Sequence, residues 1–361
     1  MNTPLHHKPL TPIESSFGNV LAYPVILNNG LVFRCSWSHH LSDLTCIARK
    51  FRLRDNRESE YVESDRCNLT RVAILGLGLM GSELARNLLS KGNDVHGFNR
   101  TRGKTKSLIE KGLVAHSTPR EAVENADVVI TMLSDQDAVS EVALGSNGFL
   151  DGMRPGSVWI DMSTILPERS IEHAKECDAR GVERLDAPVA GGPERAFKGK
   201  LVIMVGGRRE VFEKHAAFLG NLGEQVVYVG PFGSGHSMKL AFNLYLAVLA
   251  TGFSEALTLA QKLGLSGQSF VDFVNKTHHK NSYTENKGPL VVKKDFTPTF
   301  TLEMMRKDLA LVEEEKLIKR ISLPVTSSVL ALFTAAMNEG FSKLDYSAIA
   351  VMLERMNGIG E

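Results

Sequence analysis

From Arg71 onward, short apolar runs alternate with segments whose apolar residues recur at helical spacing. The apolar runs predict buried strands, and the periodic segments predict amphipathic helices. The predicted strands are 72–75, 95–98, 114–115, 127–132, 157–161, 182–185, 201–205 and 225–229, and the predicted helices between them are 82–91, 104–111, 135–144, 167–180 and 210–220. Strand–helix alternation with short connections predicts an α/β fold with a doubly wound parallel sheet.

Beyond Gly235 the strand pattern stops, and only helical periodicity remains. The predicted helices are 238–263, 268–275, 302–319, 325–339 and 346–355. The first of these is apolar on most faces, which predicts burial between domains or between subunits. We therefore expect an α/β domain at residues 71–233 and an all-α domain at residues 234–361, and a homodimer or homotetramer.

Residues 1–70 differ from the rest of the chain. Their periodicity is weak, and through Arg54 the only acidic residues are Glu14 and Asp43, a bias typical of organelle transit peptides. Three interpretations stay open: a disordered extension, a targeting peptide, or a start assigned too far upstream. We favour the first and third, because the segment lacks the Arg- and Ser-rich amphipathic helix of a transit peptide.

Composition narrows the class of protein. The 361 residues are 43% hydrophobic and 23% charged, with a net charge of +1, so no strong field indicates a nucleic-acid or membrane partner. No uninterrupted apolar run approaches the ~20 residues of a membrane span. The four cysteines include no CxxC pair, so we expect no metal site. A reducing compartment follows, with a cytoplasmic location as the simplest expectation and organelle targeting as the alternative.

The segment Gly76-Leu77-Gly78-Leu79-Met80-Gly81 lies between the first predicted strand and the first predicted helix. In this context the spacing is typical of a dinucleotide-binding loop. The first glycine permits a tight turn, the second lets the backbone approach a pyrophosphate, and the third lets the helix pack closely. The alternative is a plain glycine-rich turn. We therefore predict a Rossmann-type domain at residues 71–233.

The end of the second strand selects the dinucleotide. NAD sites usually place Asp or Glu there, whereas this chain has Asn99-Arg100-Thr101. A guanidinium can bind a 2′-phosphate through two parallel hydrogen bonds, which a carboxylate would repel. We therefore favour NADP, with NAD as the alternative. A solvated surface arginine is the other interpretation of Arg100.

Two further patterns can carry chemistry. Ala190, Gly191 and Gly192 follow a predicted strand, and consecutive glycines there can expose N–H groups to a carboxylate or form only a tight turn. Lys239 and Asn243 share one face of a largely apolar helix. A desolvated lysine in a cofactor cleft can donate a proton to a carbonyl oxygen, whereas a lysine with its ammonium in solvent is the alternative.

Together these motifs resemble the β-hydroxyacid dehydrogenase family, which includes 3-hydroxyisobutyrate dehydrogenases and glyoxylate/succinic semialdehyde reductases. The resemblance covers roughly residues 71–355, and also includes Met132-Leu133-Ser134, Asp161–Thr164, Lys307-Asp308 and Asp345–Ala348. It implies that Lys239 is the general acid/base and that Asn243 assists it. It also implies that Ala190, Gly191 and Gly192 bind the substrate, and that Leu133, Ser134, Thr164 and Lys307 line the nicotinamide side. For Lys307 considered alone, a surface ion pair is the alternative.

Two departures from the family pattern affect the pocket. Ala190 stands where the family usually has Ser, and Phe242 where it often has a second Asn. The function that the resemblance implies is NADP-dependent interconversion of a small hydroxy acid and its semialdehyde or keto form. The alternatives are an NAD-dependent 3-hydroxyisobutyrate dehydrogenase, which Asn99 and Arg100 disfavour, and a catalytically silent scaffold, which Lys239 disfavours.

Overall fold

The computed structural model describes residues 13–14, 20–27, 30–37 and 70–359, and the chain divides into two units, Met1–Asn68 and Leu69–Glu361. In the first unit, β1 (Ile13–Glu14), β2 (Val20–Leu27) and β3 (Gly30–Trp37) form an antiparallel sheet in the order β1-β2-β3. The interpretations of residues 1–70 as disordered, targeting or misassigned concern mainly residues outside the described ranges.

The second unit contains a nine-stranded sheet. Its strands are β4 (Arg71–Leu75), β5 (Asp94–Phe98), β6 (Val114–Ala115), β7 (Val128–Thr131), β8 (Val158–Asp161), β9 (Glu183–Asp186), β10 (Val189–Ala190), β11 (Leu201–Gly207) and β12 (Gly223–Gly230). Strands β9-β8-β7-β4-β5-β6 lie side by side and are parallel, as the alternation predicts. The predicted doubly wound sheet is confirmed for these six strands.

The two remaining long strands run the other way. β11 pairs antiparallel with both β9 and β10, and β12 is parallel to β11. The pairs Asp186↔Gly206 and Val189↔Ile203 belong to one continuous antiparallel register. The chain therefore turns back as a wide hairpin after β10 rather than crossing a face of the sheet. The expectation of a fully parallel sheet is wrong at this edge, because the apolar run 201–205 carries no information on strand direction.

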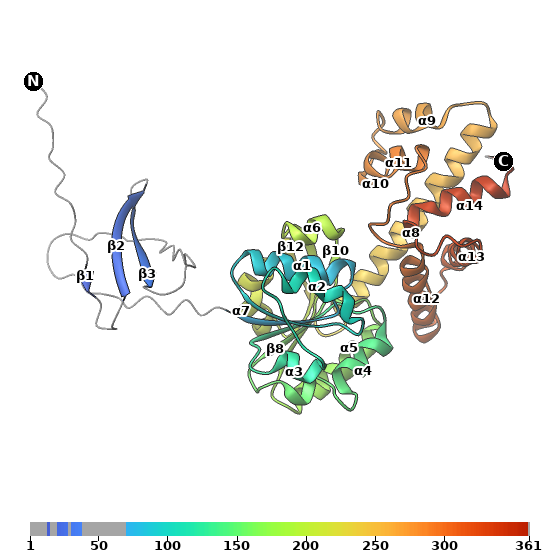
Figure 1. The fold of residues 1–361 in the computed structure, drawn as a ribbon. Helices are drawn as coiled ribbons and strands as arrows, with labels where there is room; N and C mark the ends of the chain where they lie inside the picture. The colour runs from blue at the N-terminus through green and yellow to red at the C-terminus, as the bar shows by residue number, and fades with distance from the viewer. Residues whose placement is uncertain (1–12, 15–19, 28–29, 38–69, 360–361) are drawn as a thin grey trace, which may run out of the picture. The chain divides into compact units, whose positions relative to one another are not determined.

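Helices cover both faces of the sheet (Figure 1). They are α1 (Leu79–Ser90), α2 (Lys106–Ile109), α3 (Pro119–Val123), α4 (Gln136–Leu144), α5 (Pro167–Asp178), α6 (Pro193–Phe197) and α7 (Arg209–Leu219), with 3-10 turns η1 (Arg102–Thr105) and η2 (Leu150–Gly152). Along β4, Val72 and Ile74 belong to one hydrophobic cluster, and Ala73 and Leu75 to the cluster on the opposite face. All four are buried, which explains why the strand is apolar at every position rather than at alternate ones.

The C-terminal part is all-α and has its own core. Its elements are α8 (Ser234–Lys262), α9 (Gly267–Val274), α10 (Ser282–Asn286), α11 (Gly288–Val292), α12 (Leu302–Lys319), α13 (Pro324–Asn338), η3 (Tyr346–Ala348) and α14 (Ile349–Met356). The core includes Phe253, Leu309 and Phe333, which come from three different helices. α12 has the predicted bounds, whereas α8 begins four residues before the predicted start at Met238.

α8 runs from the sheet domain into the helical domain (Figure 1). By length and composition it could cross a membrane, although polar residues interrupt its apolar runs. Core helices of globular proteins meet the same criteria, and α8 packs against β11, α12 and α14. Leu240 of α8 also joins Leu166, Leu311 and Val312 in a small cluster between the two domains. We attribute the hydrophobicity of α8 to this packing.

Candidate active site

The glycine loop joins β4 to α1. Gly76 has φ +102°, which L side chains rarely adopt. A Cβ on Gly81 would lie 1.9 Å from the carbonyl oxygen of Gly76, so only glycine lets α1 begin so close to the loop. Gly78 is the N-cap of α1, and a Cβ there would meet nothing within 4 Å. The backbone at Gly78 therefore borders open space at a helix N-terminus, where a pyrophosphate can approach.

One residue of this motif lies elsewhere than predicted. Gly76, Gly78, Leu79, Met80 and Gly81 line the cleft, whereas the Leu77 side chain is buried in the sheet core. The backbone N–H of Leu77 donates to Asn99 Oδ1 at 2.9 Å. Any contribution of Leu77 to cofactor binding is therefore indirect, through the shape of the loop.

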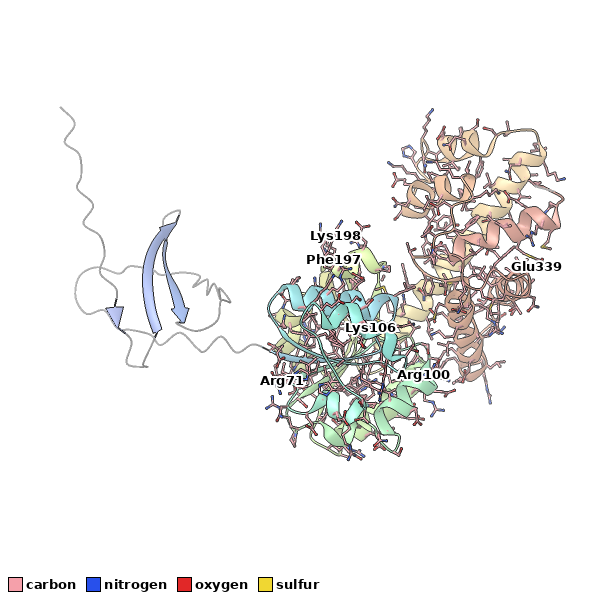
Figure 2. The ribbon with its side chains drawn as sticks, viewed as in Figure 1. Arg71, Arg100, Lys106, Phe197, Lys198 and Glu339 are labelled. Carbon is pink, nitrogen blue, oxygen red and sulfur yellow. The ribbon has the colours of Figure 1, made fainter. Side chains whose placement is uncertain are left out.

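The tip of β5 forms the adjoining wall. Asn99, Arg100 and Thr101 all line the cleft, and so does Lys104, which the sequence analysis did not select. The Asn99 amide is held between the Leu77 N–H and the Thr101 carbonyl, 2.9 Å from each. Arg100, labelled in Figure 2, is exposed. The tip thus offers two cations and, at position 99, a neutral amide in place of a carboxylate.

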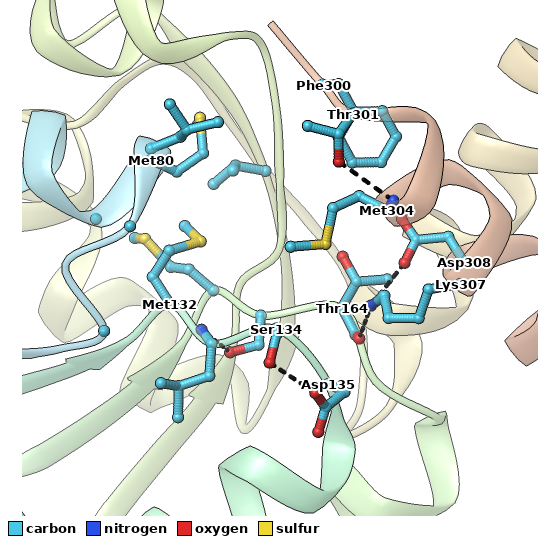
Figure 3. A pocket seen from close by; sticks show the side chains of 18 of the residues that line it. Met80, Met132, Ser134, Asp135, Thr164, Phe300, Thr301, Met304, Lys307 and Asp308 are labelled. Atoms are coloured by element: carbon cyan, nitrogen blue, oxygen red, sulfur yellow. Dashed lines mark hydrogen bonds and ion pairs between the residues drawn. The ribbon is translucent and has the colours of Figure 1, made fainter. Parts of the chain in front are cut away.

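The ends of β7 and β8 form the floor of the cleft. The Leu133 N–H donates to Ser163 Oγ at 3.0 Å, and the Ser134 hydroxyl donates to Asp135 at 2.6 Å. Thr164 accepts a hydrogen bond of 3.0 Å from Lys307 Nζ through its carbonyl oxygen. Figure 3 shows Lys307 reaching from α12 toward Thr164. Leu133, Ser134, Thr164 and Lys307 are brought together as predicted, although they come from both domains.

Lys239 lies on the cleft wall, in the second turn of α8. Its ammonium donates to the carbonyl oxygen of Val189 at 2.8 Å, and it lies 5.7 Å from the centre of the Phe242 ring. Burial lowers the pKa of Lys239 to about 8, Asp308 acts in the opposite direction, and Lys307 lowers the pKa further. Lys239 therefore points into the cleft rather than into bulk solvent, which excludes the alternative of a solvent-directed lysine.

Behind Lys239 lies a buried polar pair. Asn243, one turn further along α8, donates from Nδ2 to Asp308 Oδ2 at 2.5 Å. Asp308 is 2% exposed, and its other carboxylate oxygen lies 2.7 Å from Lys307 Nζ. Lys307 does form an ion pair, but with a buried carboxylate at the cleft and not at the outer surface. Asp308 was not selected from the sequence, because nothing in the local pattern of α12 shows that it faces Asn243.

The start of α8 is fixed by a carboxylate from the sheet. Asp186, at the end of β9, accepts hydrogen bonds from Gly233 N at 3.1 Å and Gly235 N at 2.7 Å. A Cβ on Gly235 would lie 2.7 Å from this carboxylate, so the glycine permits the contact. Next to it, His236 Nε2 lies 3.6 Å from the buried Asp161 carboxylate. His236 is fully buried and does not line the cleft, which makes it a structural neighbour of Lys239.

The loop predicted to bind the substrate borders the same space. Ala190, Gly191 and Gly192 line the cleft, and Gly191 has φ +127°. A Cβ on Gly192 would lie 3.6 Å from Cβ of Thr299, which belongs to the helical domain. The tertiary structure thus adds a second wall to this end of the cleft. Its residues, none of which was given a site role from the sequence, are Lys287, Thr299, Phe300, Met304 and Tyr346.

The complete cleft has a volume of about 1460 Å³ and is lined by residues from both domains. Figure 3 shows Met80 and Met132 on the sheet-domain side, opposite Met304, Lys307 and Asp308. The open backbone at Gly78 and the cations of the β5 tip suit an extended nucleotide bearing phosphates. Within residues 70–359, no group of three or more His, Cys, Asp or Glu side chains is arranged to hold a metal ion.

Comparison with known proteins agrees with this architecture. Residues 71–230 match the family described as the NAD-binding domain of 6-phosphogluconate dehydrogenase. Residues 233–353 match the family described as NAD-binding of NADP-dependent 3-hydroxyisobutyrate dehydrogenase. The two matches together span both domains of the second unit.

Individual relatives match over most of their length. Glyoxylate/succinic semialdehyde reductase 1 of Arabidopsis thaliana is 33% identical over 77% of this chain and 96% of its own. The chloroplastic glyoxylate/succinic semialdehyde reductase 2 of the same plant is 31% identical over 80% and 81%. The structure of 3-hydroxyisobutyrate dehydrogenase from Mycobacterium tuberculosis with L-serine has a TM-score of 0.72 and 31% identity, covering 79% of this chain and 99% of that one. The chain belongs to the β-hydroxyacid dehydrogenase family, and it is an NAD(P)-binding oxidoreductase of the class that acts on CH–OH groups.

Proposed function

We propose that the protein is an NADP-dependent oxidoreductase that interconverts a small 3-hydroxy acid, or a related hydroxy acid, with its semialdehyde or keto form. The observation that carries this proposal is the position of Lys239. Its ammonium lies at the cleft wall and donates to the Val189 carbonyl oxygen, one helical turn before Asn243, which bonds to Asp308. A titratable group in such a cleft, with a pKa lowered to about 8, is suited to proton transfer near neutral pH.

Gly76–Gly81 and the β5 tip would hold a nicotinamide dinucleotide, which would supply the hydride in reduction and accept it in oxidation. Lys239 supplies the proton. In the reductive direction, the protonated ammonium donates to the carbonyl oxygen of the substrate as negative charge develops there. In the oxidative direction, the neutral amine accepts the hydroxyl proton. Because the ammonium also donates to the Val189 carbonyl, its direction is set before the substrate arrives.

Asn243 and Asp308 support this lysine. The carboxylate of Asp308 favours the protonated form of Lys239, and its hydrogen bond fixes the Asn243 amide on the same face of α8. Asn243 is buried but lines the cleft, so its carbonyl oxygen can orient the ammonium or the substrate hydroxyl. We propose that Asn243 assists proton transfer by holding the reacting oxygen in reach of Lys239.

The preference for NADP rests on the β5 tip. Arg100 and Lys104 line the cleft beside Thr101, and the residue at the end of β5 is the amide Asn99. A 2′-phosphate gains charge-assisted hydrogen bonds from these cations and meets no repelling carboxylate at position 99. NAD-dependent 3-hydroxyisobutyrate dehydrogenase activity is the alternative, which this tip disfavours. We also propose that the protein is a homodimer or homotetramer, because α8 leaves apolar side chains exposed.

The deciding experiment measures oxidation of NADPH by the purified full chain with glyoxylate, succinic semialdehyde, tartronate semialdehyde and methylmalonate semialdehyde. We expect turnover of at least one substrate. Lys239→Ala should lower kcat by about a hundredfold or more, because proton transfer is lost. The Kd for NADPH, measured by fluorescence, should stay within about twofold of the wild-type value, because Lys239 contacts the proposed substrate loop and not the glycine loop.

Lys262→Ala is the matched control, since Lys262 is an exposed lysine at the far end of α8. A Lys239→Ala protein that keeps full activity would refute the assignment of Lys239. A wild-type protein that binds NADPH and reduces none of the four substrates would favour the scaffold alternative or a different substrate class.

A further inference from the structure

The helical domain forms one end of the cleft, where the ammonium of Lys287 is held against the buried carboxylate of Asp345. Lys287 lies between α10 and α11, Thr299 lies in the segment before α12, and Asp345 directly precedes η3. Lys287 Nζ donates to Asp345 Oδ2 at 2.6 Å and to Thr299 Oγ1 at 2.9 Å. None of these three residues takes part in the proton transfer proposed above.

The two charges of this pair are not equally accessible. Asp345 is 1% exposed and does not line the cleft, whereas Lys287 and Thr299 do. The carboxylate also accepts hydrogen bonds from Ser347 N and Oγ and from Thr299 N, so it is well satisfied without solvent. Burial alone would raise the pKa of Asp345, but the bonds from Lys287 and Thr299 lower it below its usual value. The carboxylate is therefore ionised, and the cleft meets the cationic side of the pair.

Lys287 has donor capacity left. An ammonium has three N–H groups, and two of them bond to Thr299 and Asp345. Among the described residues, no acceptor is bonded to the third. Tyr346 also lines the cleft, and the centre of its ring lies 5.6 Å from Lys287 Nζ. The ring therefore holds the ammonium from another side. Such a fixed, partly desolvated cation at a cleft wall favours an anionic ligand.

This cation lies near the loop that the proton donor contacts. Thr299, bonded to Lys287, lies beside Gly192, where a Cβ would come within 3.6 Å of it. Val189, two residues before Gly191, accepts the hydrogen bond from Lys239. The segment 189–192 therefore connects the proton donor to Lys287 along one side of the cleft. Because Gly191 and Gly192 have no side chains, a ligand can lie close to the backbone between the two lysines.

We infer that Lys287, supported by Thr299 and Asp345, forms an anion subsite that binds the carboxylate of the substrate, while Lys239 serves the carbonyl at the other end. This inference rests on the proposed function, because it assigns the second end of the same substrate. It predicts that the enzyme selects aldehydes and alcohols that carry a carboxylate over neutral analogues of the same length. The charge of Lys287, and not only the hydrophobic shape of the cleft, would set this selection.

The test compares succinic semialdehyde with its uncharged methyl ester as substrates of the full chain with NADPH. Lys287→Met should raise KM for the acid about tenfold or more, because a charge-assisted hydrogen bond is lost. KM for the ester and kcat for both substrates should change by no more than about twofold, because the proton donor is untouched. Lys287→Arg should restore part of the preference for the acid. Lys293→Met, an exposed lysine that does not line the cleft, is the matched control.

A second measurement does not depend on turnover. Calorimetry with succinate and the NADPH-bound protein should show weaker binding to Lys287→Met than to the wild type. An equal rise in KM for acid and ester, or unchanged succinate binding, would overturn the inference and leave Lys287 a structural residue. If Lys287→Met fails to fold because Asp345 loses its partner, the double variant Lys287→Met/Asp345→Asn removes both charges and provides the same comparison.

The two proposals fail in different ways. Absence of turnover by the wild type with any aldehyde would contradict the proposed function. Turnover of acid and ester with equal kcat/KM by the wild type would contradict the anion subsite alone.

Discussion

At the scale of single residues, three influences set the proton affinity of Lys239, and one of them opposes the other two. Burial lowers its pKa and Lys307 lowers it further, while Asp308 raises it, and the balance is a pKa of about 8. At neutral pH most Lys239 side chains are therefore protonated, but the pKa lies within about one unit of the pH. Such a group can donate a proton in one direction of the reaction and accept it in the other.

The sign of the pH dependence follows. The rate of carbonyl reduction should fall as the pH rises through about 8, because the proton donor is lost, and the rate of alcohol oxidation should rise over the same range. Asp308→Asn removes the influence that raises the pKa, so both midpoints should move to lower pH. Rates of both directions measured from pH 6 to about 10 check this. Glu314→Gln, an exposed position on the same helix, should leave the midpoints unchanged.

A second prediction at this scale concerns Arg100. Arg100→Ala should raise KM for NADPH by about ten- to a hundredfold, because charge-assisted hydrogen bonds to the 2′-phosphate are lost. KM for NADH should change little, since NADH has no 2′-phosphate. Arg102→Ala is the control, because Arg102 begins η1 and does not line the cleft. An equal effect of Arg100→Ala on both cofactors would contradict the proposed NADP preference.

At the scale of elements, α8 carries the proposed proton donor, and Asp186 fixes its first turn. The helix has no side-chain cap of its own, so the carboxylate from β9 satisfies N–H groups that would otherwise be buried without partners. The same helix then continues into the core of the helical domain. The position of Lys239 therefore depends on a contact between β9 and α8, and not only on the helical period.

Asp186→Ala should lower the free energy of unfolding by about 2 kcal/mol or more, because buried N–H groups lose their acceptor. It should also lower kcat in native protein, because the first turn of α8 is no longer fixed. Urea denaturation and steady-state kinetics measure the two effects. Ser266→Ala removes the exposed cap of α9, which does not line the cleft, so it should cost about 1 kcal/mol without changing kcat. A fall in stability with unchanged kcat for Asp186→Ala would show that the cap does not position Lys239.

At the scale of the whole molecule, one side of α8 is incompletely covered. Met238, Tyr245 and Leu259 of α8, and Leu263 directly after its last residue, are between 47% and 71% exposed. Apolar patches of this kind are typical of protein–protein interfaces. A second copy of the chain is the partner we propose.

We expect light scattering of the full chain to give the mass of a dimer or a tetramer. The double variant Leu259→Glu/Leu263→Glu should shift the distribution toward the monomer, because two charges would be buried in the contact. Val114→Lys, an exposed position on β6, should leave the mass unchanged. A wild-type protein that is monomeric at every concentration would contradict the proposal.

The sequence by itself determined the features that depend on short stretches of chain. The glycine loop, the β5 tip and the bounds of α12 follow from local steric and periodic requirements, so they were predictable residue by residue. The reversal of β11 was not, because an apolar strand looks the same in either direction. Only the tertiary structure decided which residues meet across the cleft. Asp308 lies 65 residues from Asn243 and Asp345 lies 58 from Lys287, and pairing at such separations depends on the packing of whole helices.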